Sequence, residues 1–201
     1  MRRVVCLVTL LLHTSPVLAQ STGQPPAQGK RTIRFTASWE APPDTLAGNW
    51  TTADAVVLGT VQRNDVRPTA TGHSNMPISG LSTLSDVLVV EVFKGDHNWA
   101  GKTIQVREHA GTYEDAEVIA RTLDSAMDIG GQYVLFLSGS RGEWHPKHGP
   151  FSVYALQAGR VAQHTMYTST LGRSSAIATA NDFIRDLRRL RDNKETPHEN
   201  P

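Results

Sequence analysis

The fold is decided by residues 84–96, which read Leu-Ser-Asp-Val-Leu-Val-Val-Glu-Val-Phe-Lys-Gly-Asp. Four of these residues are valine, and they stand beside leucine and phenylalanine. Such β-branched and aromatic side chains suit a pleated, half-buried surface. The run ends at Lys94-Gly95-Asp96, because glycine adopts a positive φ without steric cost and so favours a turn. The stretch predicts a central strand around which shorter strands close.

Further stretches predict strands of the same sheet. A second strong strand signal lies at 53–61, where Gly59 indicates a bulge or a bend. Residues 102–107 alternate cleanly, with Ile104 and Val106 facing inward. Residues 132–137 are apolar on both faces, which predicts a strand that is covered on both sides. The series ends with a strand at 151–156, a turn at Ala158-Gly159 and a short hairpin partner at 160–164.

Three polar segments between these strands predict loops. The segments 63–80 and 139–150 are rich in turn residues and lack strong apolar periodicity. The segment 109–129 leaves two interpretations open. Its apolar residues could form one face of a short amphipathic helix, or the segment could be an irregular excursion between strands.

The carboxy-terminal part predicts an amphipathic helix that starts near Thr179 or Asn181, either of which can cap it. Its apolar residues recur at spacings of three and four, with arginines opposite them. A polar tail follows at 193–201. Five or six strands, glycine-marked bends and this helix together predict a mainly β fold, a small and partly open barrel in residues 46–192. The apolar helix residues are Phe183, Ile184, Leu187 and Leu190.

The amino terminus has the parts of a secretory signal peptide. It begins with Met1-Arg2-Arg3, continues with an apolar run at 4–12 and offers Val17-Leu18-Ala19 for cleavage before Gln20. We therefore expect residues 1–19 to be removed and the chain to be exported to the periplasm or the medium. Residues 20–45 then form a flexible leader, in which the alternation at 32–36 allows a short edge strand.

Composition narrows the classes of partner. The chain has 20 Lys and Arg against 19 Asp and Glu, and loss of Arg2 and Arg3 leaves 18 against 19. Near-neutral charge gives no reason to expect a nucleic-acid partner. The one cysteine, Cys6, lies in the expected signal peptide. The exported chain would be cysteine-free, and its core would stabilise it without disulfides. No later apolar stretch is long enough to span a membrane.

The strand series resembles a known group of secreted proteins. The stretches 53–61, 90–95 and 131–137 look like strands of secreted bacterial proteins of unassigned function. Those proteins are similar in turn to the OB-fold barrel of tissue inhibitors of metalloproteinases and netrin-like modules. The resemblance covers roughly residues 53–161 and implies an OB-like barrel of five to six strands. It implies little about function, since the matching residues form strands and not a site. The inhibitors bind the protease zinc through an amino-terminal cysteine, which the chain would lack.

The best metal-like spacing is His145-Pro146-Lys147-His148, with Glu143 close by. Two histidines three residues apart can share a metal, although Pro146 prevents a regular helix from presenting them together. The alternative is a polar loop between strands. The histidines at 73, 97 and 109 also fall in expected loops. The carboxylates of 108, 114, 115 and 117 allow either a hydrolytic pair or a solvated loop.

The four tryptophans, Trp39, Trp50, Trp99 and Trp144, lie outside the strong strand stretches. Aromatic side chains in loops can form a sugar-binding or protein-binding face, or they can fill the ends of a barrel. The residues that we select as binding candidates are Trp99, Trp144, His145 and His148.

Three functional hypotheses follow from these features. The first is an exported, non-enzymatic binding module of the cell envelope, which contacts an unknown protein or glycan through the expected loops. The second is a metal-dependent hydrolase that uses the pair His145 and His148. The third is a protease inhibitor that acts through a loop. No Gly-x-Ser-x-Gly motif or phosphate-binding glycine loop occurs, and no catalytic residue or cofactor is predicted.

Overall fold

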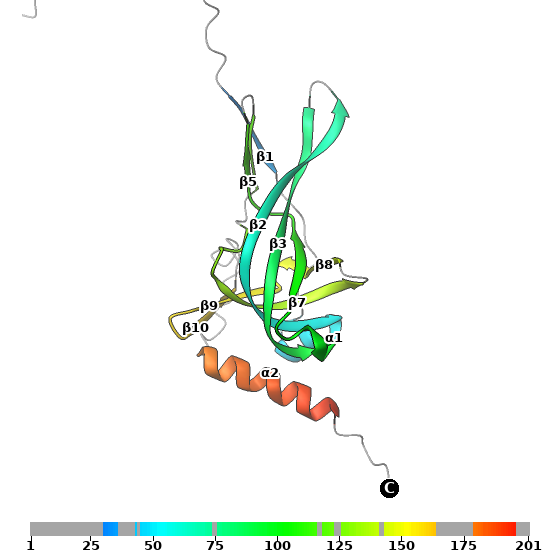
Figure 1. Cartoon of the computed structure of the whole chain (residues 1–201), viewed down its shortest axis with the longest axis vertical. Helices are drawn as coiled ribbons and strands as arrows, with labels where there is room; N and C mark the ends of the chain where they lie inside the picture. Colours follow the sequence, from blue (N-terminus) through cyan, green and yellow to red (C-terminus); the bar gives the residue numbers. More distant parts are fainter. Residues whose placement is uncertain are drawn as a thin grey trace, which may run out of the picture.

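The computed structural model describes residues 30–35, 43, 45–73, 76–115, 118–122, 126–140, 143–163 and 179–195, and it is mainly β (Figure 1). The expected signal peptide at 1–19 lies outside these residues, as do leader residues 20–29 and the end of the tail. No helix of the described part is long and apolar enough to span a membrane. The helices are α1 (Leu46–Thr52), the 3-10 helix η1 (His97–Trp99) and α2 (Ala180–Glu195). The strands are β1 (Arg31–Phe35), β2 (Ala55–His73), β3 (Met76–Lys94), β4 (Thr103–Glu108), β5 (Thr112–Glu114), β6 (Val118–Thr122), β7 (Gln132–Ser140), β8 (Glu143–Pro150), β9 (Val153–Gln157) and β10 (Arg160–Gln163).

Seven strands form the main sheet in the order β10-β9-β7-β2-β3-β4-β8. Neighbours in this order are antiparallel except β4 and β8, which are parallel. Strand β8 also pairs with β7. The pairings β2–β3, β3–β4, β4–β8, β8–β7 and β7–β2 therefore return to the strand from which they start, and the main sheet contains a closed circuit of five strands.

The opening stretch forms the second half of β3, as predicted, and β3 ends at Lys94. Gly95 follows with a φ of 113°, a conformation that suits glycine and turns the chain. The bend predicted at Gly59 is also confirmed, because the register between β2 and β3 shifts between Leu58 and Gly59. A Cβ on Gly59 would lie 2.4 Å from a Val87 side-chain carbon, so the strands approach closely there.

Two hydrophobic clusters lie on opposite faces of β7. Tyr133, Leu135 and Leu137 belong to the first cluster, and Val134 and Phe136 belong to the second. This alternation confirms that 132–137 is covered on both sides. The first cluster is built by residues of β2, β3, β4, β7 and β9, and the second is completed by the two α-helices.

Residues 63–80 are part of a β-hairpin, so the predicted loop is wrong. Strands β2 and β3 stay paired from Arg63 opposite Asp86 to His73 opposite Met76. We call residues 67–73 and 76–82 the arm, since β4 pairs with β3 only from Thr83 onward. The arm extends beyond the main sheet (Figure 1). A two-stranded ribbon with solvent beside it does not require apolar residues, which explains why its polar sequence resembled a loop.

A second sheet, in the order β1-β6-β5, lies beside the arm (Figure 1). It corrects the prediction for 109–129, because the described residues there include the strands β5 and β6 and no helix. Gly111 has a φ of 122°, and a Cβ on it would lie 2.8 Å from Thr83 Oγ1. Strand β1 pairs in parallel with β6. The short edge strand allowed by the leader sequence is therefore present, and these leader residues are part of the fold.

The two α-helices cover the second cluster. In α1, Trp50 is buried, and the Lys94 ammonium of β3 donates hydrogen bonds to the carbonyl oxygens of Trp50, at 2.8 Å, and Ala53. A cation at these carbonyl groups suits the carboxy-terminal end of a helix. In α2, Phe183 and Leu187 are buried against the sheet, as the spacing predicted. The helix continues to Glu195, so the polar tail begins later than residue 193.

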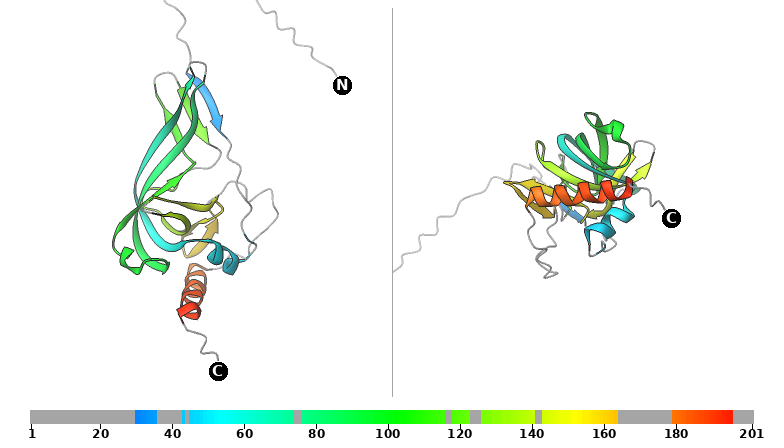
Figure 2. Two further views of the ribbon diagram at one scale, coloured as in Figure 1. Left: turned by 90° about the vertical axis from the view of Figure 1, so that its right-hand side faces the viewer. Right: turned by 90° about the horizontal axis from the view of Figure 1, so that it is seen from below.

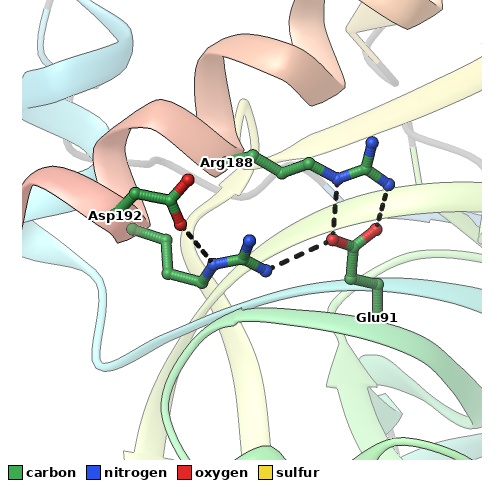
Figure 3. A network of polar contacts seen from close by, with 4 residues as sticks. Glu91, Arg188 and Asp192 are labelled. Carbon is green, nitrogen blue, oxygen red and sulfur yellow. Dashed lines mark hydrogen bonds and ion pairs between the residues drawn. The ribbon is translucent and has the colours of Figure 1, made fainter. Parts of the chain in front are cut away.

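Charged side chains tie α2 to β3 (Figure 3). Arg188 donates to both carboxylate oxygens of Glu91, with Nε at 2.9 Å and Nη2 at 2.8 Å. Arg191 Nη1 lies 3.4 Å from the same carboxylate, and its Nε donates to Asp192 at 3.0 Å. The hydrogen bonds from Arg188 lower the pKa of Glu91 below its ordinary value, because they favour the charged carboxylate.

Candidate functional site around strand β8

Residues 143–150 form strand β8, so the loop predicted for 139–150 is wrong. Trp144 lies opposite Gly139 of β7 in an antiparallel pairing and opposite Val106 of β4 in a parallel one. A Cβ on Gly139 would lie 2.2 Å from the Glu143 carbonyl oxygen, so only glycine fits this close approach. Trp144, His145 and His148 thus belong to the strand that closes the five-strand circuit.

The structure does not bring His145 and His148 together. Residues three apart on a strand point to opposite faces, and His145 is exposed whereas His148 is 4% exposed. His145 Nε2 lies 3.2 Å from Ser138 Oγ of β7. His148 Nε2 lies 3.4 Å from Thr52 Oγ1 at the end of α1. The two imidazoles face different elements, which is not the arrangement that a shared metal ion requires.

The third metal candidate, Glu143, makes a different contact. Its Oε1 lies 2.9 Å from Arg107 Nη2 of β4, and both side chains are largely exposed. Within the residues that the structure describes, no three His, Cys, Asp or Glu side chains form a group that could hold a metal ion. Two of the histidines expected in loops lie on other elements, since His73 ends β2 at the arm and His97 lies in η1, after the end of β3.

Trp99 and Trp144 contact each other, with ring centroids 4.9 Å apart and ring planes at 63°. Both are partly buried and pack against the first cluster together with Ile104. Trp50 is 2% exposed within the second cluster. Trp39 lies outside the described residues. The three described tryptophans therefore fill the core and its margin, the alternative that we set against an aromatic binding face.

Two of the carboxylates considered for hydrolysis have other contacts within the chain. Glu108 is 7% exposed and accepts a hydrogen bond from the Met127 backbone at 3.2 Å. Glu114 is exposed and pairs with Lys30 at 2.6 Å. Glu117 lies outside the described residues.

Burial raises the pKa of Tyr133, whose hydroxyl accepts from the Asp128 backbone at 2.8 Å. This phenol therefore stays protonated at neutral pH and is no general base.

Charged side chains on the neighbouring strands β2 and β3, and on β4 and β8, form ion pairs with each other. Arg63 Nη2 lies 2.7 Å from Asp86 Oδ2, and Gln105 Nε2 donates to Asp86 Oδ1 at 3.2 Å. These three residues join β2, β3 and β4, and Arg107 is paired with Glu143 at the next strand. A surface that binds nucleic acid offers basic side chains to phosphate groups. Here the arginines are already engaged by carboxylates, which agrees with the near-neutral charge of the chain.

Most of the arm lies within the segment 63–80, which the sequence predicted to be a partner-binding loop. Strands β5 and β6, from the expected segment 109–129, lie beside the arm at one end of the molecule (Figures 1 and 2). The third segment, 139–150, forms β8 and the end of β7. No local pattern in 63–80 or 109–129 indicated strands, since neither segment contains a run of alternating apolar residues.

The chain matches no protein-family model, and no curated protein matches its sequence.

Proposed function

We propose that the chain is an exported, non-enzymatic binding module, an OB-like barrel that presents the arm to a protein of the cell envelope. The closed circuit β2-β3-β4-β8-β7 supports the OB-like interpretation, because an OB-fold is a five-stranded barrel. The amino-terminal sequence supports export. The placement of His145 and His148 on opposite faces of β8 supports a role without catalysis.

The arm is the observation that carries this proposal. Strands β2 and β3 each contain 19 residues, whereas strands of globular proteins usually have about five or six. The circuit uses only part of this length, since β4 pairs with β3 from Thr83 to Leu88. A two-stranded ribbon alone is marginally stable in water. Among the described elements, the arm has only the small sheet β1-β6-β5 beside it, so a partner that contacts this end of the molecule would add to the stability of the arm.

A protein is the partner that the charges favour. Two arginines at the base of the arm are paired, since Arg67 Nη2 lies 2.5 Å from Asp65 Oδ2 and Arg63 Nη2 lies 2.7 Å from Asp86 Oδ2. A polyanion would gain little from such a neutral surface. A protein can contact the backbone and side chains of the arm even though the arm carries little net charge. A glycan, the other envelope partner expected from the sequence, is an outcome that the test distinguishes.

The test shortens the arm and leaves the main sheet intact. Residues 69–80 are replaced by Asn-Gly, which joins Pro68 to Leu81 across an existing strand pair with a two-residue hairpin turn. Leu81 is 2% exposed and is retained to protect the packing beneath it. Crosslinking in an envelope extract should capture a defined protein with the full chain and lose it with the short arm. Ile129→Asp, at a 64% exposed residue, is the matched control and should keep it.

Three results would reject the proposal. The first is equal capture by the short-arm variant when its unfolding midpoint is unchanged. The second is capture of glycan fragments alone, which would replace the protein partner by a glycan. The third is turnover of a peptide or ester by the purified chain that one substitution abolishes. The metal-dependent alternative is tested separately by zinc analysis, because the double variant His145→Ala/His148→Ala would have to lose bound zinc.

A further inference from the structure

A hollow of about 510 Å³ lies between the β9–β10 turn, the start of β7 and the first turns of α2. Figure 1 places these elements at the end of the molecule opposite the arm. Sites for small molecules in proteins typically have about 300–1,000 Å³. The hollow is therefore large enough for a ligand, and it is separate from the surface proposed for the protein partner.

The walls of the hollow are fixed by contacts within the chain. The Ala180 backbone donates to the Gly159 carbonyl oxygen at 2.9 Å, which joins α2 to the β9–β10 turn. Further along the same helix, Leu187 is fully buried in the second cluster. Leu156 and Ile184 line the hollow and are packed against that cluster. A ligand would enter a preformed space with an aliphatic floor.

The charges around the hollow are already balanced. Arg188 lines it, but its Nε and Nη2 donate to Glu91 (Figure 3). The start of α2 is capped, since Thr179 Oγ1 accepts from the Asp182 backbone at 3.1 Å. Asp182 also pairs with Arg185. Among the described residues that line the hollow, Arg188 alone is charged, and its pairing with Glu91 offsets the attraction of an anion, so an uncharged ligand fits this lining best.

We propose that this hollow binds a small, uncharged, polyhydroxylated molecule of the size of a monosaccharide. Gln132 and Asn181 are exposed and line the hollow on β7 and α2. Each carboxamide offers both donors and acceptors, the combination that hydroxyl groups need. The apolar ring face of the ligand packs on Leu156 and Ile184. The described residues that line the hollow include no aromatic ring, and we expect a dissociation constant on the order of 1 mM.

The experiment is a titration of the full, isotope-labelled chain followed by backbone amide NMR, with glucose, galactose and N-acetylglucosamine as probes. At least one sugar should shift the amides of Gly159, Asn181 and Ile184. Gln132→Ala and Asn181→Ala should each weaken binding by about five- to tenfold, since each removes hydrogen bonds worth about 1 kcal/mol. Gln105→Ala removes the same group from the exposed surface of β4 and should leave binding unchanged.

Several outcomes would overturn the inference. No shift with any sugar at about 100 mM would do so, since a millimolar site would then be saturated. Equal affinity in wild type and both variants would place the sugar elsewhere. Tighter binding of inorganic phosphate at the same amides would show an anion site. The short-arm variant keeps the hollow and should bind the sugar normally, so this result is independent of the proposed protein partner.

Discussion

Replacement of Leu187 by alanine should remove much of the stability that α2 provides. Leu187 is fully buried in the second cluster between the helix and the sheet. The substitution deletes three carbon atoms, and about 0.8 kcal/mol for each gives about 2.4 kcal/mol of lost transfer free energy. The remaining cavity adds to this loss, so we expect the free energy of unfolding to fall by about 3–4 kcal/mol. Domains are stable by only about 5–15 kcal/mol.

Urea unfolding followed by tryptophan fluorescence measures this loss directly. Trp50 is 2% exposed in the same cluster, so its emission reports whether that cluster is intact. Arg185→Ala is the control on the same helix, because its guanidinium is exposed and pairs only three residues away with Asp182. It should cost less than about 0.5 kcal/mol. A loss for Leu187→Ala below about 1 kcal/mol, with an unchanged urea slope, would refute the docking of α2 on the sheet.

Two further substitutions test the ion network and the closure of the circuit. Glu91→Gln should cost about 1 kcal/mol at pH 7, since it removes the charge-assisted bonds from Arg188. The folded-state pKa of Glu91 is lowered below 4.5, so the carboxylate stabilises the fold above that pH, and its contribution is lost as the pH falls through the lower folded value. Urea unfolding of wild type and Glu91→Gln at pH 7 and pH 3 measures this contribution. An equal loss of stability at both pH values would contradict the prediction. Gly139→Ala should cost more than about 2 kcal/mol, because its φ is 140° and its Cβ would meet the backbone of Glu143. Gly130→Ala has a φ of 82° but open space, so thermal unfolding should show a loss of only about 1–2 kcal/mol.

The strands of the core could be predicted because their burial determines their composition. Val87, Val89 and Val92 of β3 are buried, and 132–137 is apolar on both faces because α-helices and the first cluster cover it from opposite sides. The start of α2 was predictable for a similar reason, since Thr179 caps it and its apolar residues follow the helical period. The arm could not be predicted in this way. The two strands of the arm need only pair through their backbones, and this pairing does not require a pattern of apolar side chains.

The two histidines of the candidate metal site lie apart because a strand and a helix differ in their period. A spacing of three residues places two side chains on one face of a helix but on opposite faces of a strand. Pro146 excluded the helix, and the remaining alternative considered was a loop. The pairings of Trp144 with Gly139 and Val106 then fix 143–150 as a strand. The contact between Trp99 and Trp144 joins η1 to β8, and no local sequence pattern could have indicated it.

The closure of the circuit also limits where a function can lie. Strand β8 must place Trp144 toward the first cluster to pair with both β4 and β7, and this fixes His145 and His148 on opposite faces. The positions of Trp144, His145 and His148 are thereby determined by the pairing of β8. The arm and the hollow beside α2 are different, because neither is needed to pair the five strands. A shortened arm or an altered Gln132 should leave the closed circuit intact while removing one binding activity each. Loss of both activities from either change would show that the two ends of the molecule are coupled and that the division proposed for them is wrong.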